Sequence, residues 1–218
     1  MELYPINLDI AGKSCAVIGG GAVALRKIRG LLAAGARVTV IAPEICQQVE
    51  ELATRGEIFL RKEKFSGDML TDEVILIAAT DSAEVNQLAA KIAHEKKILV
   101  NVAAGEGGNF NVPSKILRGD LLLTISTGAN SPAFARFLRQ MLEAELGENF
   151  AAGLALIARK RQELKKILPD HEARKIFWRQ ILTRRTWQLL KTGELETLEA
   201  TINHALESFG AEPQDGTD

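Results

Sequence analysis

The sequence is poor in the residues that bind metals or form disulfides. Its 218 residues include two cysteines, Cys15 and Cys46, which do not form a CxxC motif. The three histidines, His94, His171 and His204, lie far apart in the sequence. A metal site built from cysteine and histidine is therefore disfavoured, and we predict no metal ligands. We expect both cysteines to be reduced residues in or near the core, as is usual in the cytoplasm.

Long apolar runs and an excess of charge are also lacking. The apolar stretches are short, as in residues 74–80 (VILIAAT), whereas a membrane-spanning helix needs about 20 apolar residues. The N-terminus carries acidic residues early and does not have the pattern of a signal peptide. A net charge of −1 does not favour a protein that binds nucleic acid through a basic surface. We therefore expect a cytoplasmic protein that binds neither membranes nor nucleic acid.

The first half of the chain alternates short apolar runs with stretches of helical periodicity. Runs typical of buried strands occupy residues 14–19, 37–42, 57–61, 74–79 and 98–102. Stretches with apolar residues at helical spacing occupy residues 23–34, 45–55 and 83–95. Short apolar strands separated by helices indicate βαβ units. We therefore predict an α/β, Rossmann-like fold with a parallel sheet that is covered on both faces.

After Pro113 the pattern changes. Residues 120–126 predict one more strand, and residues 133–146 predict a helix that Ser131 caps and that has Pro132 near its first turn. The chain from residue 153 onward is charged and has helical periodicity, which predicts a helical C-terminal part. Its last residues, 210–218, are expected to form a frayed tail.

The first predicted strand ends in a glycine-rich turn. Residues 19–24 (GGGAVA) fit the pattern G-x-G-x-x-G/A between a strand and a helix, which is the context that dinucleotide binding requires. The first glycine permits the tight turn, the second lets the backbone approach a pyrophosphate, and the helix N-terminus offers N–H groups to it. The alternative is a glycine turn without a ligand. The predicted cofactor residues here are Gly19, Gly20, Gly21, Ala22 and Val23.

The second predicted strand lacks the acidic residue that commonly binds the ribose of NAD. It ends at Ala42 and Pro43, which we expect beside the nucleotide, and the nearest carboxylate is that of Glu44. The usual acid therefore does not decide between NAD and NADP. Because no basic pair follows this strand, NAD is slightly favoured.

The fourth predicted strand ends at Thr80 and Asp81, where a bound nucleotide would pass. Both residues are candidates for contacts with the ribose or the nicotinamide side. Alternatively, one of them only caps the helix that follows. The sequence leaves the two interpretations equally open.

Four motifs follow one another in a set order. They are residues 12–43 (GKSCAVIGGGAVALRKIRGLLAAGARVTVIAP), 77–90 (IAATDSAEVNQLAA), 100–114 (VNVAAGEGGNFNVPS) and 121–139 (LLLTISTGANSPAFARFLR). Together they resemble the precorrin-2 dehydrogenase family, which also forms the front part of sirohaem synthases. The resemblance covers about residues 1–150, and the later helices fit the family's variable C-terminal part. No methyltransferase part follows in this sequence, so we expect a stand-alone enzyme.

The resemblance implies oxidation of precorrin-2 to sirohydrochlorin with NAD+, Fe2+ insertion in some members, and a homodimer. By position, Thr80 and Asp81 would lie beside the nucleotide, and Asn101 would lie near the cofactor at the end of the fifth strand. Ser126 and Thr127 match the family's substrate-side loop. The implied regions are an NAD-binding Rossmann domain at 1–114, a dimerisation and substrate-side region at 115–150, and a helical C-terminal domain at 151–218.

The sequence departs from the family at the position of its candidate acid/base. The family usually has an aspartate where this chain has Ala104, and the loop before Phe110 is about one residue shorter. Glu106 is the nearest carboxylate and is a candidate stand-in, although it could equally be a solvated loop residue. Thr127 keeps a hydroxyl where the family often has serine, so Glu106 and Thr127 are the predicted catalytic residues. Because a general base contributes about 10²–10⁴-fold, its loss would slow dehydrogenation without abolishing it, whereas iron insertion becomes the weaker expectation.

A tetrapyrrole polycarboxylate requires cations near its site. The candidate cations are Lys115, Arg118, Arg136 and Arg139. Of these, Lys115, Arg136 and Arg139, together with Ser126, are the predicted substrate-binding residues. Arg136 and Arg139 lie one helical turn apart and can share a face. A solvated charged surface is at least as good an interpretation for each of them. The pair of Arg26 and Lys27 is interpreted as charge packed along the first helix.

Two other functions stay open at this point. One is an NAD-binding regulatory module, which would share the glycine turn but has no need of the segments around residues 111–114 and 126–132. The other is a catalytically impaired tetrapyrrole-binding protein, which Ala104 makes plausible. An NAD-dependent spectral change with precorrin-2 would separate dehydrogenase from both.

Overall fold

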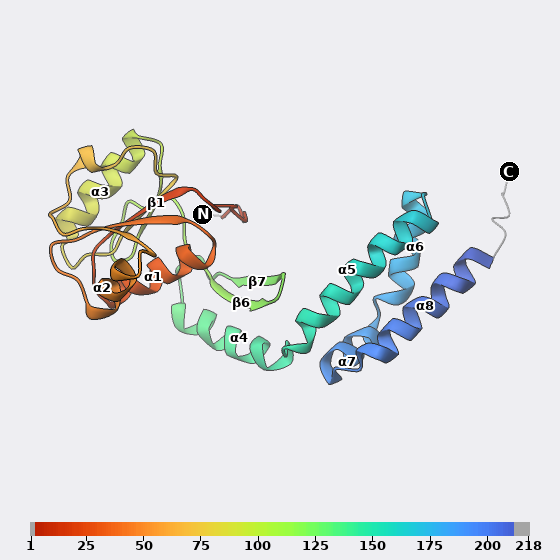
Figure 1. Ribbon diagram of the computed structural model, residues 1–218. Coiled ribbons are helices and arrows are strands. Elements are labelled where there is room, and N and C mark those ends of the chain that lie inside the picture. The colour runs from red at the N-terminus through yellow and green to blue at the C-terminus, as the bar shows by residue number, and fades with distance from the viewer. Residues whose placement is uncertain (1–2, 212–218) are drawn as a thin grey trace. The chain divides into compact units, whose positions relative to one another are not determined.

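The computed structural model describes residues 3–211 and divides the chain into two units, Met1–Val112 and Pro113–Asp218. The first unit is α/β and the second contains a hairpin and helices (Figure 1). The predicted C-terminal tail lies outside the described residues, except that the last helix extends to Ala211. Among the described residues, the first unit contains two hydrophobic clusters and the second contains one, each made of residues of that unit alone.

The first unit contains a five-stranded parallel sheet in the order β3-β2-β1-β4-β5. The strands are β1 (Ser14–Ile18), β2 (Arg37–Ile41), β3 (Phe59–Arg61), β4 (Ile75–Ala78) and β5 (Leu99–Val102). The helices are α1 (Ala22–Ala33), α2 (Gln47–Thr54) and α3 (Ala83–Glu95), with a short 3-10 turn, η1, at Gly67–Met69. The predicted Rossmann-like α/β fold is confirmed.

Both faces of this sheet are buried. Along β1, Cys15 and Val17 belong to the cluster that α1 and α2 cover, whereas Ala16 and Ile18 belong to the cluster that α3 covers (Figure 1). This alternation follows from the two-residue period of a strand. Burial raises the pKa of the Cys15 thiol to about 11, so the thiol stays protonated at neutral pH. Both cysteines are free, as predicted.

The second unit begins with an antiparallel hairpin, β6 (Ser114–Arg118) and β7 (Leu121–Ile125), and continues as helices. The helices are α4 (Pro132–Glu145), α5 (Asn149–Ile167), α6 (His171–Ile181), α7 (Arg184–Thr192) and α8 (Leu195–Ala211). Ser131 caps α4 by accepting a hydrogen bond from the backbone of Phe134, and Pro132 is the first helical residue, as predicted. Strand β6 and helix α7 were not predicted from the sequence.

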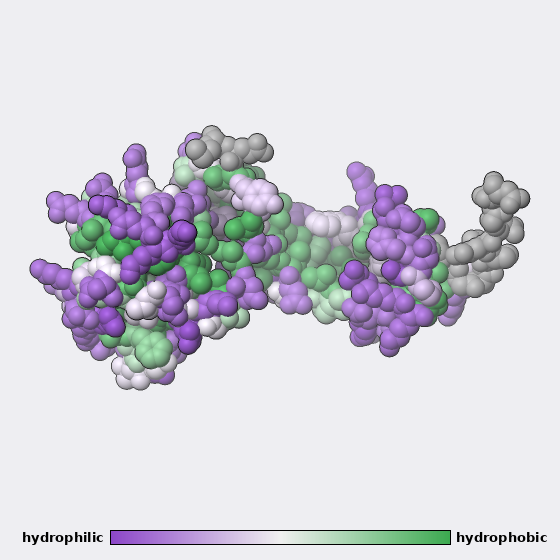
Figure 2. All heavy atoms as spheres, turned by 90° about the horizontal axis from the view of Figure 1, so that it is seen from above, coloured by the Kyte–Doolittle hydropathy of each residue, from purple (hydrophilic) through white to green (hydrophobic). Residues whose placement is uncertain are grey.

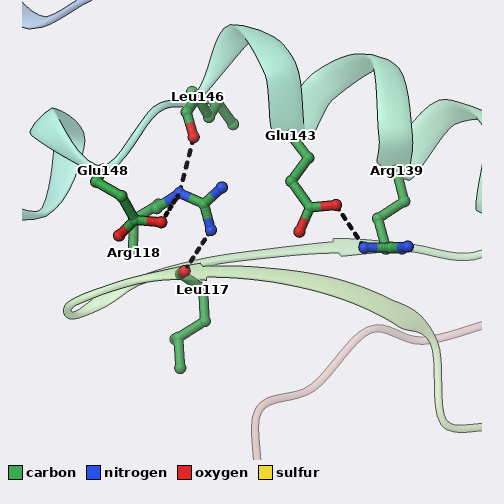
Figure 3. A network of polar contacts seen from close by, with 6 residues as sticks. All are labelled: Leu117, Arg118, Arg139, Glu143, Leu146 and Glu148. Atoms are coloured by element: carbon green, nitrogen blue, oxygen red, sulfur yellow. Dashed lines mark hydrogen bonds and ion pairs between the residues drawn. The ribbon is translucent and has the colours of Figure 1, made fainter.

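Arg118 fastens the hairpin to the turn between α4 and α5 (Figure 3). Its Nε donates to the carbonyl oxygen of Leu146 at 2.8 Å, and its Nη1 donates to that of Leu117 at 2.9 Å. Oε1 of Glu148 lies 3.3 Å from the same Nε and forms an ion pair with it. Because the Arg118 side chain is only 13% exposed and its Nε and Nη1 donate to backbone carbonyls, Arg118 is a structural cation.

The second unit exposes several large apolar side chains on its hairpin and on α4. Leu117 and Leu122 pair across the hairpin and are exposed, and on α4 so are Phe134, Phe137 and Met141. Figure 2 shows apolar side chains over the hairpin, whereas polar side chains cover the helices nearer the C-terminus. Contiguous exposed apolar surface of this kind is typical of a protein–protein interface.

Candidate functional site

The first unit contains a cavity of about 940 Å³ at the carboxyl ends of its parallel strands. The sheet order changes direction around β1, which is where open α/β sheets bind ligands. Loops that follow β1, β2, β4 and β5 contribute to its lining. The predicted cofactor residues that line it are Gly19, Gly20, Gly21, Ala22, Val23, Ala42, Pro43, Thr80 and Asp81.

The glycine turn is shaped so that two of its positions admit no side chain. Gly19 has a φ of +118°, and a Cβ there would lie 2.3 Å from the carbonyl oxygen of Ala79. A Cβ at Gly20 would lie 2.4 Å from the carbonyl oxygen of Glu44. A Cβ at Gly21 would meet no described atom within 4 Å, so the missing side chain leaves open space in the cavity wall. The turn therefore permits a ligand to approach the backbone closely.

The N-terminus of α1 suits an anion. Gly21 is the N-cap residue and has no side chain that could accept hydrogen bonds from the first-turn N–H groups. The first turn also has no acidic residue. These N–H groups and the positive end of the helix dipole fit the pyrophosphate of a dinucleotide.

The loop after β2 packs directly against the glycine turn. The backbone N–H of Cys46 donates to the carbonyl oxygen of Gly20 at 2.8 Å. Glu44 is exposed and lines the cavity, and among the described contacts its carboxylate makes no hydrogen bond or ion pair. The other described carboxylate in the lining is that of Asp81.

Thr80 is held at the end of β4 by a side chain of α3. Its hydroxyl donates to Oδ1 of Asn86 at 2.8 Å, and Nδ2 of Asn86 donates to the carbonyl oxygen of Thr80 at 2.9 Å. The cap of α3 is Ser82, whose hydroxyl accepts from the backbone of Val85. The alternative in which Thr80 or Asp81 caps this helix is therefore wrong, and Asp81 stays exposed in the cavity lining.

Asn101 is buried beneath the loop that follows β5. Its Oδ1 accepts from Nζ of Lys27 at 3.0 Å, and its Nδ2 donates to the carbonyl oxygen of Phe110 at 3.0 Å. Burial, with a smaller effect of Arg26, lowers the pKa of Lys27. Asn101 is not among the residues that line the cavity, so its contact with the cofactor stays a prediction. Lys27 thus holds Asn101, which in turn holds the loop at Phe110. This role of Lys27 was missed, because a lysine in a charged helix gives no sign of such a partner.

The loop from residue 103 to 110 carries the predicted stand-in base. Gly105 and Gly107 have positive φ values of 117° and 96°, and Nε2 of His94 lies 2.8 Å from the carbonyl oxygen of Gly107. Because a carbonyl only accepts, this His94 nitrogen carries the proton. Ala104 lines the cavity, whereas Glu106 is exposed and is not among the lining residues.

The predicted substrate-side residues all belong to the second unit. Arg139 forms an i,i+4 ion pair with Glu143 (Figure 3). The Thr127 hydroxyl donates to the carbonyl oxygen of Ser131 at 3.1 Å and accepts from its N–H at 3.3 Å, so it shapes the turn before α4. The remaining predicted residues are exposed side chains: Lys115, Ser126 and Arg136. Ser126 accepts a hydrogen bond from the N–H that follows Thr127.

Residues 3–211 contain neither a metal-binding cluster nor a helix that could cross a membrane. Within that range no three side chains of histidine, cysteine, aspartate or glutamate gather where they could hold a metal ion. In the same part of the chain, every helix is too short or too polar to cross a membrane.

Two protein-family models match the chain. The family described as "Putative NAD(P)-binding" matches residues 6–114, which contain the glycine turn and the cavity. The family described as "Sirohaem synthase dimerisation region" matches residues 154–206, which lie in the helices from α5 to α8. The first match covers half of the chain.

Curated relatives and a solved structure match almost the whole chain. A protein named "Siroheme synthase" from Nitrosococcus oceani is 35% identical over 217 residues, which are 99% of this chain and 46% of that protein. "Siroheme synthase 3" from Aeromonas hydrophila is 36% identical over 219 residues, 99% of this chain and 46% of the relative. The chain thus spans about half the length of these relatives. A solved chain titled "SirC, precorrin-2 dehydrogenase" has a TM-score of 0.78 and 25% identity, covering 94% of this chain and 100% of that one.

Proposed function

The chain belongs to the precorrin-2 dehydrogenase family, which includes the front part of sirohaem synthases, and we propose that it oxidises precorrin-2 to sirohydrochlorin with NAD+. The observation that carries the proposal is the likeness to SirC, which extends over 94% of this chain and therefore over both units. A regulatory NAD-binding module would account for the first unit alone.

The residues of the cavity fit NAD+. The N–H groups at the start of α1 would hold the pyrophosphate, and the bare backbone of Gly21 lets it approach. Thr80 and Asp81 would lie beside the ribose or the nicotinamide side of the dinucleotide. The hydrogen bonds between Thr80 and Asn86 hold Thr80 in place there. When bound, NAD+ accepts the hydride that the substrate loses. The protein supplies binding and orientation, which can provide up to about 7–11 kcal/mol of the barrier reduction.

The substrate's carboxylates require cations. We propose that Lys115 and Arg136 bind these carboxylates, because neither side chain is engaged in an ion pair among the described residues. Both are exposed, and among the described contacts neither has an acidic partner. Arg139 would act together with Glu143, which already pairs with it. Ser126 offers a hydroxyl in the turn that Thr127 shapes.

Dehydrogenation also releases a proton, and we propose Glu106 as its acceptor. Glu106 is two residues from Ala104 in a glycine-rich loop, and Ala104 lines the cavity. Replacing Glu106 by glutamine is expected to slow turnover by about tenfold or more, because general bases contribute about 10²–10⁴-fold. Initial rates at saturating NAD+ measure this effect.

Asp81 provides the matched comparison, because this acidic residue lines the cavity itself. If Glu106 is the acceptor, Asp81→Asn changes turnover less than Glu106→Gln does at equal NAD+ occupancy. A tenfold loss with Asp81→Asn and an unchanged rate with Glu106→Gln would assign the proton to Asp81 instead. NADH binding to both variants separates a cofactor defect from a chemical one.

The proposed function is tested by mixing the full chain with precorrin-2 and NAD+ and following the absorption spectrum of sirohydrochlorin. An NAD+-dependent increase above the protein-free rate is expected. A chain that binds NADH and gives no such increase is not a dehydrogenase, and binding of the tetrapyrrole without turnover would identify an impaired binding protein. Adding Fe2+ to the same mixture measures iron insertion, for which Ala104 predicts a slower reaction than dehydrogenation.

We also propose a homodimer that forms through the apolar surface of the second unit. The rings of Phe134 and Phe137 stack with centroids 6.1 Å apart, and both side chains are 51% exposed. In size-exclusion chromatography with light scattering, the measured molar mass is expected to be that of two chains for the wild type and that of one chain for Phe137→Glu. The reason is that a charge in the centre of an apolar interface loses its hydration without gaining a partner.

Gln140→Glu is the control for this variant. It introduces the same charge at an exposed polar position of α4, so the dimer should persist. A Phe137→Glu chain that stays dimeric would show that α4 is outside the interface.

A further inference from the structure

Glu44 is an acidic residue in the lining of the cofactor cavity, although β2 itself ends without an acid. The strand ends at Ile41, and Glu44 follows three positions later in the loop that leads to α2. The side chain is exposed and lines the cavity. In dinucleotide-binding folds, an acid about 20 residues beyond the glycine turn receives hydrogen bonds from the adenosine ribose. Glu44 is therefore the acidic residue that the loop contributes to the cavity lining where the strand lacks one.

The backbone of Glu44 is fixed against the glycine turn. A Cβ on Gly20 would lie only 2.4 Å from the carbonyl oxygen of Glu44, so the two backbones are in close contact. The hydrogen bond from the N–H of Cys46 to the carbonyl oxygen of Gly20 holds the loop there. The ribose is attached directly to the pyrophosphate, so a group fixed beside this turn is within reach of it.

We propose that Glu44 binds the hydroxyls of the adenosine ribose and thereby makes the chain select NAD+ over NADP+. Both ribose hydroxyls can donate to one carboxylate, and hydrogen bonds to a charged acceptor are the stronger ones. The 2′-phosphate of NADP+ replaces one donor by a dianionic group, which the Glu44 carboxylate repels.

Lys64 is the opposing charge and does not cancel this preference. It is the cation among the described residues that line the cavity. Lys64 follows β3, and β3 lies outside β2 in the sheet, one strand farther from the glycine turn than the loop that carries Glu44. Because Lys64 is exposed, solvent and salt screen its attraction for a phosphate.

Direct binding tests this inference, which rests on the cofactor part of the proposed function and not on the tetrapyrrole reaction. Titration of the full chain with NADH and with NADPH, followed by nicotinamide fluorescence, is expected to show at least about a tenfold preference for NADH. Glu44→Gln should reduce that preference by about tenfold, mainly through weaker NADH binding, and Glu44→Lys should favour NADPH.

Two further variants control for charge. Glu63→Gln removes a carboxylate next to Lys64 that does not line the cavity, and it should leave both affinities unchanged. Lys64→Gln should also leave the preference for NADH in place. The proposal is overturned if the wild-type chain binds both dinucleotides equally, if Glu44→Gln keeps the full preference, or if Lys64→Gln rather than Glu44→Gln changes it. A chain that selects NADH through Glu44 but does not oxidise precorrin-2 would refute only the proposed function.

Discussion

Gly19→Ala is expected to weaken NADH binding by at least about 100-fold, which corresponds to about 2.7 kcal/mol. The added methyl group would stand 2.3 Å from the carbonyl oxygen of Ala79, which is backbone and cannot rotate away. At a φ of +118°, alanine also adopts a sparsely populated conformation that costs about 1–3 kcal/mol. The turn must move to relieve both, and the N–H groups at the start of α1 then lose their alignment with the pyrophosphate. Fluorescence titration with NADH measures the loss.

Two other glycines distinguish lost binding from lost folding. Gly30→Ala lies in the exposed part of α1 with no described atom near its Cβ, so it should stabilise the helix by up to about 1 kcal/mol and leave NADH affinity unchanged. Gly21→Ala also meets no neighbour and should fold, but its methyl group enters the space that the pyrophosphate needs, so affinity should fall. Unchanged NADH affinity in folded Gly19→Ala and Gly21→Ala would show that the dinucleotide does not bind at this turn.

The secondary structure was predictable where burial has a clear period. Strand β4 is buried at all four positions, and α3 buries Ala89, Ala90 and Ala93 at helical spacing, so both stand out in the sequence. Strand β6 was missed because only Ile116 is fully buried and its other residues are polar or exposed. Helix α7 begins with two arginines and buries little besides Thr186 and Leu189, which leaves a weak apolar pattern.

The cofactor site was predictable to the extent that local spacing determines it. The glycine turn has a fixed geometry over six residues, and its residues line the cavity as the spacing implies. The contact between Lys27 and Asn101 joins positions 74 residues apart, so it depends on how α1 crosses the sheet toward β5. The position of Glu44 at the cavity likewise depends on how the loop packs against Gly20, which a strand pattern does not contain. Local chemistry was therefore predictable, whereas partners brought together by packing were not.

Phe177→Ala is expected to destabilise the second unit by about 3–5 kcal/mol, because it empties the centre of an aromatic and aliphatic core. Phe177 is fully buried among the helices from α5 to α8, where its ring meets that of Trp178 edge-on at 5.3 Å. The chain's two tryptophans, Trp178 and Trp187, both belong to this unit, so urea unfolding followed by tryptophan fluorescence reports on it alone. With a slope of about 1–3 kcal/mol per molar urea, the midpoint should fall by about 1 M or more.

The same variant tests whether the two units are stabilised separately. The first unit has its own two clusters around the sheet, so the Phe177→Ala chain should bind NADH with unchanged affinity below its unfolding transition. Ile176→Ala, on the same helix but 49% exposed, is the control and should move the midpoint by much less. If the Phe177→Ala chain lost NADH binding together with the stability of its second unit, the dinucleotide site would need the helical unit for its own stability. Retained binding together with lost dehydrogenation would assign to the second unit a role in the reaction itself, consistent with substrate residues such as Lys115 and Arg136.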